Sequence, residues 1–385
     1  MAKHVTRREL GLAAVAAATA MGSSQAALLS GGGALDLTDG VTAKEFDPVA
    51  WTMDQYADAP LRLTFRASSK AEAKIWQSDL RSKLVELLGG FPPRISLQPR
   101  IIEVRQFPGY KREKFVFESR PGVAVVGYLL TPTNAVRPIP AVVCIPGHGR
   151  GVDDIVGIDE NGKDRSGKPG YQHDFAIQVV EHGLAAVAIE PAAFGYRRDL
   201  ITRKKGQTAT ACQPAAGSAL LLGQTMIGWR VWDTMRTIDW IETRPELDSS
   251  RIGCVGISGG GTCTQFTAAL DERIKVAFVS GYLNTFRDSI MSVSHCIDNY
   301  VPGILNWAEN YDVAGLIAPR YLFSEGGNHD PIFPVNATIA SFDKVKRVYE
   351  TLGVPDRVQQ EIFDGVHEFH GRRGLPFLQQ ALLSA

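Results

Sequence analysis

The chain has 385 residues, of which 44% are hydrophobic and 21% are charged, so it is long enough for one large α/β domain or two small ones. Its 41 Lys and Arg residues balance its 41 Asp and Glu residues. A formal net charge of zero gives no electrostatic reason to expect a nucleic acid or an anionic membrane surface as a partner, which favours small molecules or neutral polymers.

The N-terminal residues 1–26 have the pattern of an export signal. A basic start with the pair Arg7 and Arg8 precedes an apolar, alanine-rich stretch, Leu10–Met21, and then small residues. The apolar stretch is too short to span a bilayer, and the arginine pair resembles a twin-arginine motif. We therefore predict an exported protein, periplasmic or secreted, without a membrane span; the alternative is a flexible tail. Residues 27–50 are interpreted as a linker and 51–385 as the folded domain.

An N-terminal extension of helical and hairpin character is predicted for about residues 51–135. Residues 68–93 have apolar side chains at helical spacing, a capping serine before them and Gly-Gly-Phe-Pro-Pro at their end, which indicates a helix. Residues 101–132 are rich in β-branched and aromatic residues and are interrupted by Pro-Gly pairs. This pattern predicts antiparallel strands joined by turns.

From residue 140 onwards, continuous apolar runs alternate with amphipathic segments. Continuous runs are typical of strands buried on both faces, so we predict a mostly parallel central sheet with helices on both faces. One of these helices lies within residues 223–245, and its tryptophans are expected in the core rather than at a substrate. Ligands of such sheets bind beyond the carboxyl ends of the strands, where we look for candidate catalytic residues.

The segment "GISGGG" places Ser258 where an apolar run ends and a helix begins. It forms a Gly-x-Ser-x-Gly pattern with Gly256 and Gly260, which is typical of a sharp strand-to-helix turn that exposes a nucleophilic hydroxyl. The amide groups at the start of the new helix, beginning near Gly259, would face negative charge that develops beside Ser258. The alternative is a glycine-rich turn without a catalytic role.

A serine nucleophile needs a base and an acid that orients it. His367 follows the last strand-like run, and Asp330 lies in a glycine-rich loop after the run before it. The order Ser258, Asp330, His367 is the order of the serine, acid and base in this kind of fold. A cap for Asp330 and a loop position for His367 are the alternatives. Glu190 is a rival acid that precedes the serine, and His329, His370 and Asp364 are less well placed.

The oxyanion hole requires a second amide besides that of Gly259. The segment "IPGHGRG" follows an early strand-like run and offers an amide at or next to Gly149. We interpret His148 in this segment as holding the loop rather than as a base.

The cysteines and histidines give no pattern for a metal site. Five cysteines are too few and too irregular for a disulfide scaffold, although one disulfide that involves Cys212 or Cys296 stays open in an oxidising compartment. His367 and His370 are three residues apart, but no His-Glu-x-x-His helix or cysteine pair accompanies them. We therefore predict no metal and no cofactor.

Over residues 60–385 the chain resembles the α/β-hydrolase superfamily, in particular its acetyl xylan esterase and dienelactone hydrolase-like branch. The matching segments occur in the family's order: "PGHGRG", "EPAAFGYRRD", "GISGGG", "LIAPRYLFSEGGNHDPIFP" and "GVHEFHG". The resemblance implies an α/β-hydrolase fold and a serine carboxylesterase that acts on acyl or methyl esters of carbohydrates through an acyl-enzyme. Dienelactone hydrolases have a cysteine where this chain has Ser258, which favours ester over lactone hydrolysis.

Substrate specificity is expected in residues 284–315, which are inserted between two core strands. Arg197 would bind a substrate carboxylate such as a uronate, or else form an ion pair with Glu190 or Asp199. Glu190 and His148 are further candidates for binding the substrate.

Two other functions fit parts of the sequence. A serine peptidase would use the same triad, but the residues before the hydrolase region are too few for a gating propeller. A non-catalytic binding protein on the same fold would be expected to lack a member of the triad. The sequence does not indicate an oligomeric state.

Overall fold

A computed structural model describes residues 47–165, 167–206 and 211–384 of the chain. It divides the chain into two compact units, with the boundary between Asp58 and Ala59. The described part of the first unit is helix α2 (Pro48–Ala57), whose first amides donate to the side chain of Asp47. Because of this cap, the helix begins at Pro48 and includes the last three residues of the predicted linker, 27–50. The predicted export signal and most of the linker lie outside the described residues.

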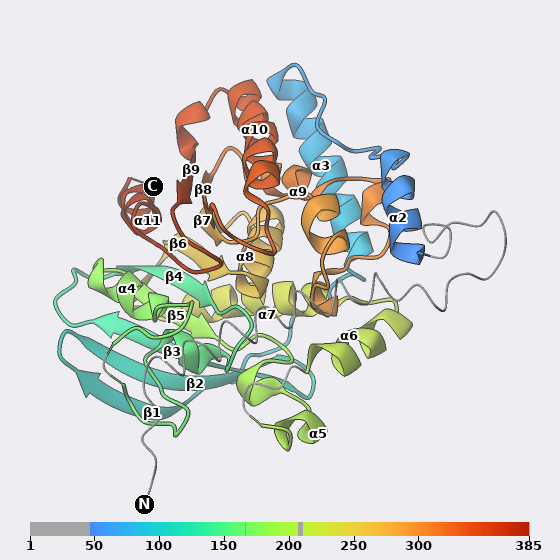
Figure 1. The fold of residues 1–385 in the computed structure, drawn as a ribbon. Helices are drawn as coiled ribbons and strands as arrows, with labels where there is room; N and C mark the ends of the chain where they lie inside the picture. Colours follow the sequence, from blue (N-terminus) through green and yellow to red (C-terminus); the bar gives the residue numbers. More distant parts are fainter. Residues whose placement is uncertain (1–46, 166, 207–210, 385) are drawn as a thin grey trace, which may run out of the picture. The chain divides into compact units, whose positions relative to one another are not determined.

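The second unit contains one mixed sheet (Figure 1). Within the described residues, its nine strands have the spatial order β1-β2-β3-β5-β4-β6-β7-β8-β9. The strands are β1 (Arg100–Phe107), β2 (Tyr110–Arg120), β3 (Val123–Pro132), β4 (Ile139–Ile145), β5 (Ala185–Ile189), β6 (Leu247–Ile257), β7 (Ile274–Ser280), β8 (Tyr321–Gly327) and β9 (Val358–Phe363).

The direction of the strands divides the sheet into two parts. Strands β1, β2 and β3 pair in antiparallel fashion, and β3 also runs antiparallel to β5. All neighbours from β5 through β4 to β9 are parallel. This arrangement confirms the predicted fold class, in which a hairpin extension precedes a mostly parallel sheet. The carboxyl ends of β4, β6, β7, β8 and β9 therefore meet at the same edge.

Helices cover both faces of the sheet (Figure 1). Side chains of α3 (Lys70–Leu87), α7 (Met226–Ile241), α8 (Gly259–Leu270) and α10 (Val335–Leu352) belong to the larger apolar core, and those of α4 (Phe175–Glu181) and α11 (Gly374–Leu383) to a second core. In β4, Val143 and Ile145 contribute to the larger core, whereas Val142 and Cys144 contribute to the second. This alternation explains why the strand is apolar along its whole length.

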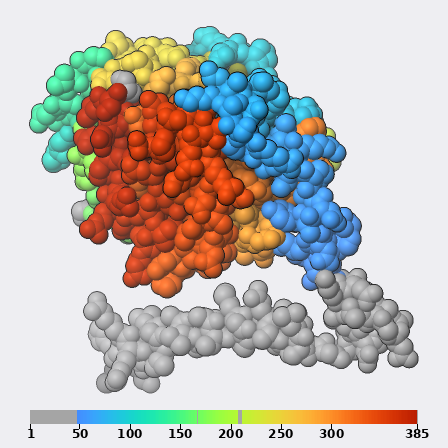
Figure 2. Space-filling view, turned by 90° about the horizontal axis from the view of Figure 1, so that it is seen from above, coloured from blue at the N-terminus to red at the C-terminus, as the bar shows by residue number. Residues whose placement is uncertain are grey.

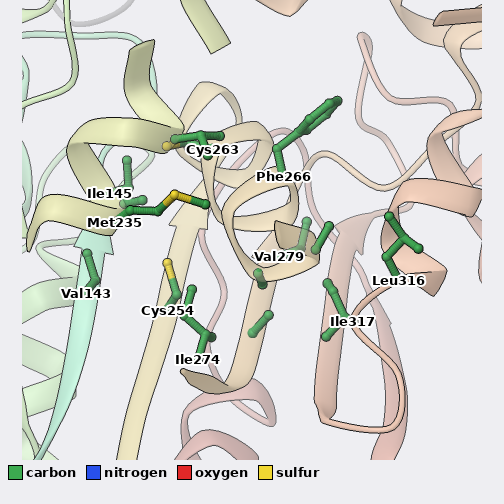
Figure 3. Packing of buried hydrophobic residues seen from close by; sticks show 14 of the residues in the cluster. Val143, Ile145, Met235, Cys254, Cys263, Phe266, Ile274, Val279, Leu316 and Ile317 are labelled. Atoms are coloured by element: carbon green, nitrogen blue, oxygen red, sulfur yellow. The ribbon is translucent and has the colours of Figure 1, made fainter. Parts of the chain in front are cut away.

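The larger core is shown in Figure 3, where Val143 and Ile145 lie near Met235 of α7, and Cys263 and Phe266 belong to α8. Trp232 and Trp240 of α7 are buried in this core, as expected from the sequence. Trp229 is only partly buried. Figure 2 shows the orange-red surface of α10 beside the light-blue surface of α3, in agreement with the contacts between the two helices.

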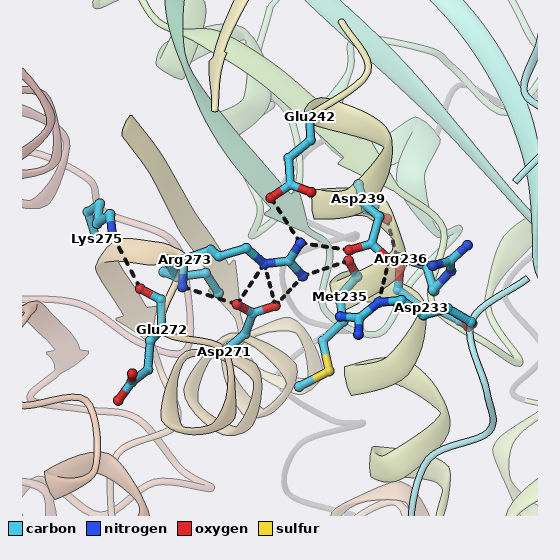
Figure 4. Close-up of polar contacts among 12 residues, drawn as sticks. Asp233, Met235, Arg236, Asp239, Glu242, Asp271, Glu272, Arg273 and Lys275 are labelled. Atoms are coloured by element: carbon cyan, nitrogen blue, oxygen red, sulfur yellow. Dashed lines mark hydrogen bonds and ion pairs between the residues drawn. The ribbon is translucent and has the colours of Figure 1, made fainter. Parts of the chain in front are cut away.

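Ion pairs join the outer helices to the loop before β7. Arg273 donates to Asp239 of α7 over 2.6 Å and to Asp271, at the end of α8, over 2.6 Å, and it also reaches Glu242 (Figure 4). These contacts hold α7 and α8 together at the amino end of β7. The ends of the strands opposite the candidate site are therefore held in place by ion pairs.

The remaining segments lie in the connections. They include α5 (Leu200–Arg203), α6 (Cys212–Leu221) and α9 (Asn310–Gly315), as well as short 3-10 and π-helical turns. Residues 284–315 lie between β7 and β8, as predicted. Among the described residues, no helix combines the length and apolar character that a membrane span requires.

Candidate active site

Ser258 occupies a strained turn between β6 and α8. It has a φ of 56° and a ψ of −122°, which is rare for a residue with a side chain. A Cβ atom on Gly260 would lie 1.9 Å from the carbonyl oxygen of Ile145, and one on Gly256 would lie 2.4 Å from that of Gly260. Only glycine fits at these two positions, which explains why the serine stands between glycines.

Asp330 and His367 are brought together at the ends of β8 and β9. His367 Nδ1 lies 2.7 Å from Asp330 Oδ2, although 37 residues separate them in the chain. The other carboxylate oxygen of Asp330 accepts the amides of Ile332 and Phe333 over 2.9 Å and 3.0 Å. Both oxygens of the Asp330 carboxylate are thus held by hydrogen bonds, and the contact at Nδ1 orients the imidazole of His367.

The second nitrogen of His367 has no partner. Its Nε2 atom is buried and makes no hydrogen bond within the described part of the chain. The ring lies between Tyr171 and Phe333, with centroid distances of 5.7 Å and 5.5 Å, and close to Gly281, where a Cβ would be 3.0 Å from His367 Cε1. A base that is oriented on one nitrogen and free on the other is suited to accept a proton.

The end of β7 connects Ser258 to the loop of His367. The amide of Ser258 donates to the carbonyl of Ser280 over 3.0 Å, and the next residue, Gly281, contacts the His367 ring. The hydroxyl of Ser280 donates to Glu325 Oε1 over 2.7 Å. Glu325 also accepts the amides of residues 370 and 371, in the same loop as His367.

Glu325 is fully buried and is not among the site residues predicted from the sequence. Burial raises its pKa to about 7, although the hydrogen bonds from Ser280, Gly371 and His370 act in the opposite direction. Its position at the end of an apolar run, in "FSEGGNHD", is the one signal that the sequence offered. The contacts of Glu325 with Ser280 and with residues 370 and 371 join segments that are far apart in the chain, so only the fold shows them.

The candidate oxyanion loop follows β4. A Cβ on Gly147 would lie 3.1 Å from Ser258 Cβ, whereas the nearest neighbours of Gly149 are Asp154 and Gln172. The loop therefore approaches the serine two residues earlier than Gly149. The Gly147 amide already donates to Gln172 Oε1 over 2.8 Å, so an amide for the oxyanion would have to come from a following residue. Gly259 is the first residue of α8, as expected.

The ring of His148 lies against Gly259, where a Cβ would be 3.1 Å from His148 Nδ1. On its other side, His148 Nε2 is 3.2 Å from Asp298 Oδ2. Burial alone would lower the pKa of His148, but the charge of Asp298 and its hydrogen bond raise it to about 9. His148 would therefore be mostly protonated near neutral pH and is a poor candidate for a general base.

Glu190 is buried and accepts hydrogen bonds from the backbone of two loops. Its side chain is fully buried, and its two carboxylate oxygens accept the amides of Val152 and Tyr196 over 3.1 Å and 3.2 Å. Burial raises its pKa to about 8. The expectation that Glu190 binds the substrate is therefore corrected: the strand end where it lies is covered by the loops that it holds together.

Arg197 lines a cavity instead of pairing with Glu190 or Asp199 through their carboxylates. Its Nη1 atom donates to Asp233 Oδ2 over 2.7 Å and to the backbone carbonyl of Glu190 over 3.0 Å. The cavity has a volume of about 720 Å³ and is rich in positive charge. We call it the cationic cavity; its lining includes Lys114, Arg120, Tyr196, Arg197, Arg198, Arg203, Trp229 and Asp233, but none of the three triad candidates.

The other rival residues have partners outside the candidate triad. His329 pairs with Asp364 at 3.4 Å on the surface, and His370 lies 3.6 Å from Glu361. Cys144 and Cys254 are buried in the core. All five cysteines are free thiols in this structure.

Comparisons with known proteins agree with this fold. The sequence pattern of the Abhydrolase family matches residues 58–373. A protein of Bacillus subtilis (strain 168) named "Putative hydrolase YtaP" is 25% identical over 289 residues, which cover 73% of this chain and 90% of that protein. Because the family pattern spans most of the sequence, the chain belongs to the Abhydrolase family, a class of α/β-hydrolase proteins.

Two solved structures show the same fold at low sequence identity. A "putative acetyl xylan esterase" from Bacteroides fragilis NCTC 9343 has a TM-score of 0.71 and 22% identity, with 85% of this chain and 84% of that chain covered. The glucuronoyl esterase from Solibacter usitatus has a TM-score of 0.61 and 14% identity, with coverages of 84% and 97%. These likenesses support the architecture rather than a particular activity.

Proposed function

We propose that the chain is a serine carboxylesterase that hydrolyses acyl or methyl esters on carbohydrates. The observation that carries the proposal is the 2.7 Å hydrogen bond between Asp330 and His367 Nδ1. The other ring nitrogen, His367 Nε2, has no partner, and it lies at the sheet edge where Ser258 occupies a strained turn. Acyl transfer requires a nucleophile, a base and an acid that orients the base. Here the three candidates follow the ends of three different strands.

The proposed reaction begins when Ser258 Oγ attacks the ester carbonyl carbon. His367 Nε2 takes the proton of the hydroxyl, and Asp330 stabilises the resulting imidazolium through Nδ1. The negative oxygen of the tetrahedral intermediate is held by the amide of Gly259 and by a second amide at or next to Gly149. His367 then gives its proton to the leaving alcohol, which produces an acyl-enzyme.

A water molecule completes the cycle by the same steps. His367 accepts a proton from the water as it attacks the acyl carbon, and it returns that proton to Ser258 Oγ when the acid leaves. The chemistry requires no cofactor. The same residues serve an acetylated sugar, which yields acetate, and a methyl ester of a uronic acid, which yields methanol.

The carbohydrate part of the proposal rests on the two structural neighbours that carry the names of an acetyl xylan esterase and a glucuronoyl esterase. A peptidase would need the same triad and would react with the same label, so it is distinguished from an esterase by its substrates. A non-catalytic binding protein is less well supported, because the Asp330 carboxylate orients an imidazole that a binding role does not need.

The first experiment is covalent labelling of the purified protein with a fluorophosphonate. We expect a single adduct, located on Ser258 by peptide mapping, and its loss in His367→Ala. The control variant is His329→Ala, because His329 lies on the surface and pairs with Asp364; it should be labelled normally. An unlabelled protein, under conditions in which a known esterase reacts, would argue for a non-catalytic binding function.

The substrate is then identified from activity on matched esters. We expect hydrolysis of acetylated or methyl-esterified sugars and no cleavage of peptide amides of the same size. If amides were cleaved faster than esters, the peptidase alternative would replace the esterase proposal.

We also propose that the chain is exported by the signal at residues 1–26. The double variant Arg7→Lys, Arg8→Lys keeps the positive charge but removes the twin-arginine pair. We expect this variant to remain inside the cell at its full mass, whereas the native protein appears outside the inner membrane in a shorter form. Equal export of both would contradict the twin-arginine route.

A further inference from the structure

Four side chains with metal-binding atoms meet next to the candidate oxyanion loop. They are His148, Cys212, Cys296 and Asp298, and one ligand atom of each lies within 4.8 Å of those of the other three. They come from three separate segments: the loop after β4, the start of α6, and the insertion between β7 and β8. The cluster is therefore a product of the fold rather than of a local motif.

The distances among three of these atoms match one face of a tetrahedron. Cys212 Sγ lies 3.8 Å from His148 Nε2 and 3.7 Å from Asp298 Oδ2, and the latter two atoms are 3.2 Å apart. Zinc bonds of about 2.0–2.1 Å to nitrogen or oxygen and about 2.3 Å to sulfur give tetrahedral edges of about 3.6 Å to sulfur and about 3.3 Å between nitrogen and oxygen. The distances among His148, Cys212 and Asp298 differ from these edges by a few tenths of an ångström at most, and the Cys296 thiol lies within 4.8 Å of the other three atoms.

The charges around the cluster also fit a divalent cation. Arg230 is buried, forms an ion pair with Asp298 and lies 3.5 Å from Cys212 Sγ through Nη2. Together, Arg230 and a divalent cation would carry three positive charges. Two thiolates and the Asp298 carboxylate would carry three negative charges, with His148 neutral. Hydrogen bonds from a neighbouring donor to a ligating sulfur and carboxylate are common around bound metals.

We propose that His148, Cys212, Cys296 and Asp298 form a binding site for a thiophilic divalent cation of the zinc type. Four protein ligands fill a tetrahedral shell and leave no open position, so the ion is structural. It ties the start of α6 and the insertion to His148, whose ring lies against Gly259. Binding displaces the proton on His148 Nε2 and the thiol protons, so uptake of the metal releases protons. This proposal departs from the prediction of no metal site that the sequence supports, because the two cysteines are 84 residues apart in the chain and carry no spacing signal.

The test measures metal content and does not depend on ester hydrolysis. The full chain, purified with a phosphine reductant and depleted of metal, is incubated with Zn²⁺ alone, desalted and analysed by inductively coupled plasma mass spectrometry. We expect about one zinc ion per chain. Replacement by Co²⁺ should give intense visible bands of tetrahedral cobalt and a thiolate charge-transfer band in the near ultraviolet.

Variants locate the site. Cys212→Ser and Cys296→Ser should both lose the zinc and the thiolate band, and circular dichroism checks that each one is folded. Cys263→Ser is the matched control, because Cys263 is buried but bonds to Thr234 outside the cluster; it should retain both signals. Cys296 is only partly buried, so its variant remains informative even if Cys212→Ser does not fold.

Two results would overturn the proposal. One is a reduced, folded chain that binds no zinc and gives no thiolate band with Co²⁺. The other is zinc binding that persists in both cysteine variants. If the reduced chain takes up no zinc and the air-exposed chain is lighter by two hydrogens, with Cys212 linked to Cys296, the pair is assigned to a disulfide instead.

Discussion

Ser280 and Glu325 are joined by a 2.7 Å hydrogen bond that connects the loops of the candidate triad. The carbonyl of Ser280 accepts the amide of Ser258 on one side. The carboxylate of Glu325 accepts the amides of His370 and Gly371 on the other. A buried carboxylate with these partners holds the nucleophile turn and the histidine loop in a common frame, and we regard Glu325 as a positioning residue.

The buried Glu325 carboxyl predicts a pH dependence of stability. Its pKa is about 7 in the folded chain, against about 4.3 in an unfolded chain. The folded state thus binds its proton more tightly, so the stability that this group contributes is complete below about pH 4 and is lost as the pH rises through 7. We expect the free energy of unfolding to fall more steeply between about pH 5 and pH 7.5 in the native protein than in Glu325→Gln.

Urea unfolding at several pH values measures this difference. Glu190 and Asp312 are also buried carboxyls with raised pKa values, but they are present in both proteins and cancel in the comparison. Parallel curves for the two proteins would show that Glu325 does not titrate differently on folding.

Asp330→Asn should reduce ester hydrolysis strongly while the fold is preserved. The amide can still accept hydrogen bonds from Ile332 and Phe333, but its NH₂ group would favour the wrong tautomer of His367. We expect kcat/KM to fall roughly 10³–10⁴-fold. Asp364→Asn is the control, because Asp364 lies on the surface and bonds only to Asn328 and His329 among the described contacts. Equal activity of both variants would remove Asp330 from the triad.

Gly260→Ala should prevent the tight turn around Ser258. The new methyl group would lie 1.9 Å from the carbonyl oxygen of Ile145, a backbone atom that cannot move aside. We expect a loss of more than about 3 kcal/mol in stability, or no folding at all. Gly217→Ala, in the helix α6, meets no atom within 4 Å and should gain up to about 1 kcal/mol. Thermal unfolding compares the two, and similar melting temperatures would contradict the close approach.

Arg197→Ala tests whether the cationic cavity recognises acidic sugars. Loss of a charge-assisted contact of about 1.5 kcal/mol should lower the ratio of activity on uronic acid esters to activity on neutral sugar esters about tenfold. The variant also leaves Asp233 with Arg120 as its remaining cationic partner, so some loss of stability is expected. An unchanged activity ratio with a lower melting temperature would show that Arg197 serves only to hold Asp233.

The types of element and the local chemistry could be predicted from the amino-acid sequence. Apolar runs without polar alternation indicated strands buried on both faces, and the glycines around Ser258 indicated a turn that no other residue tolerates. The same reasoning placed Asp330 and His367 after the last two strands. Residues at strand ends can be recognised in the sequence because an apolar run directly precedes them.

The contacts between side chains that are distant in the chain became evident only in the fold. It enclosed Glu190, brought Gly147 rather than Gly149 closest to Ser258, joined Glu325 to two loops, and assembled His148, Cys212, Cys296 and Asp298. These contacts depend on the order of strands in the sheet and on the path of long insertions. Periodicity and turn signals describe a few neighbouring residues, so they carry no information on such contacts.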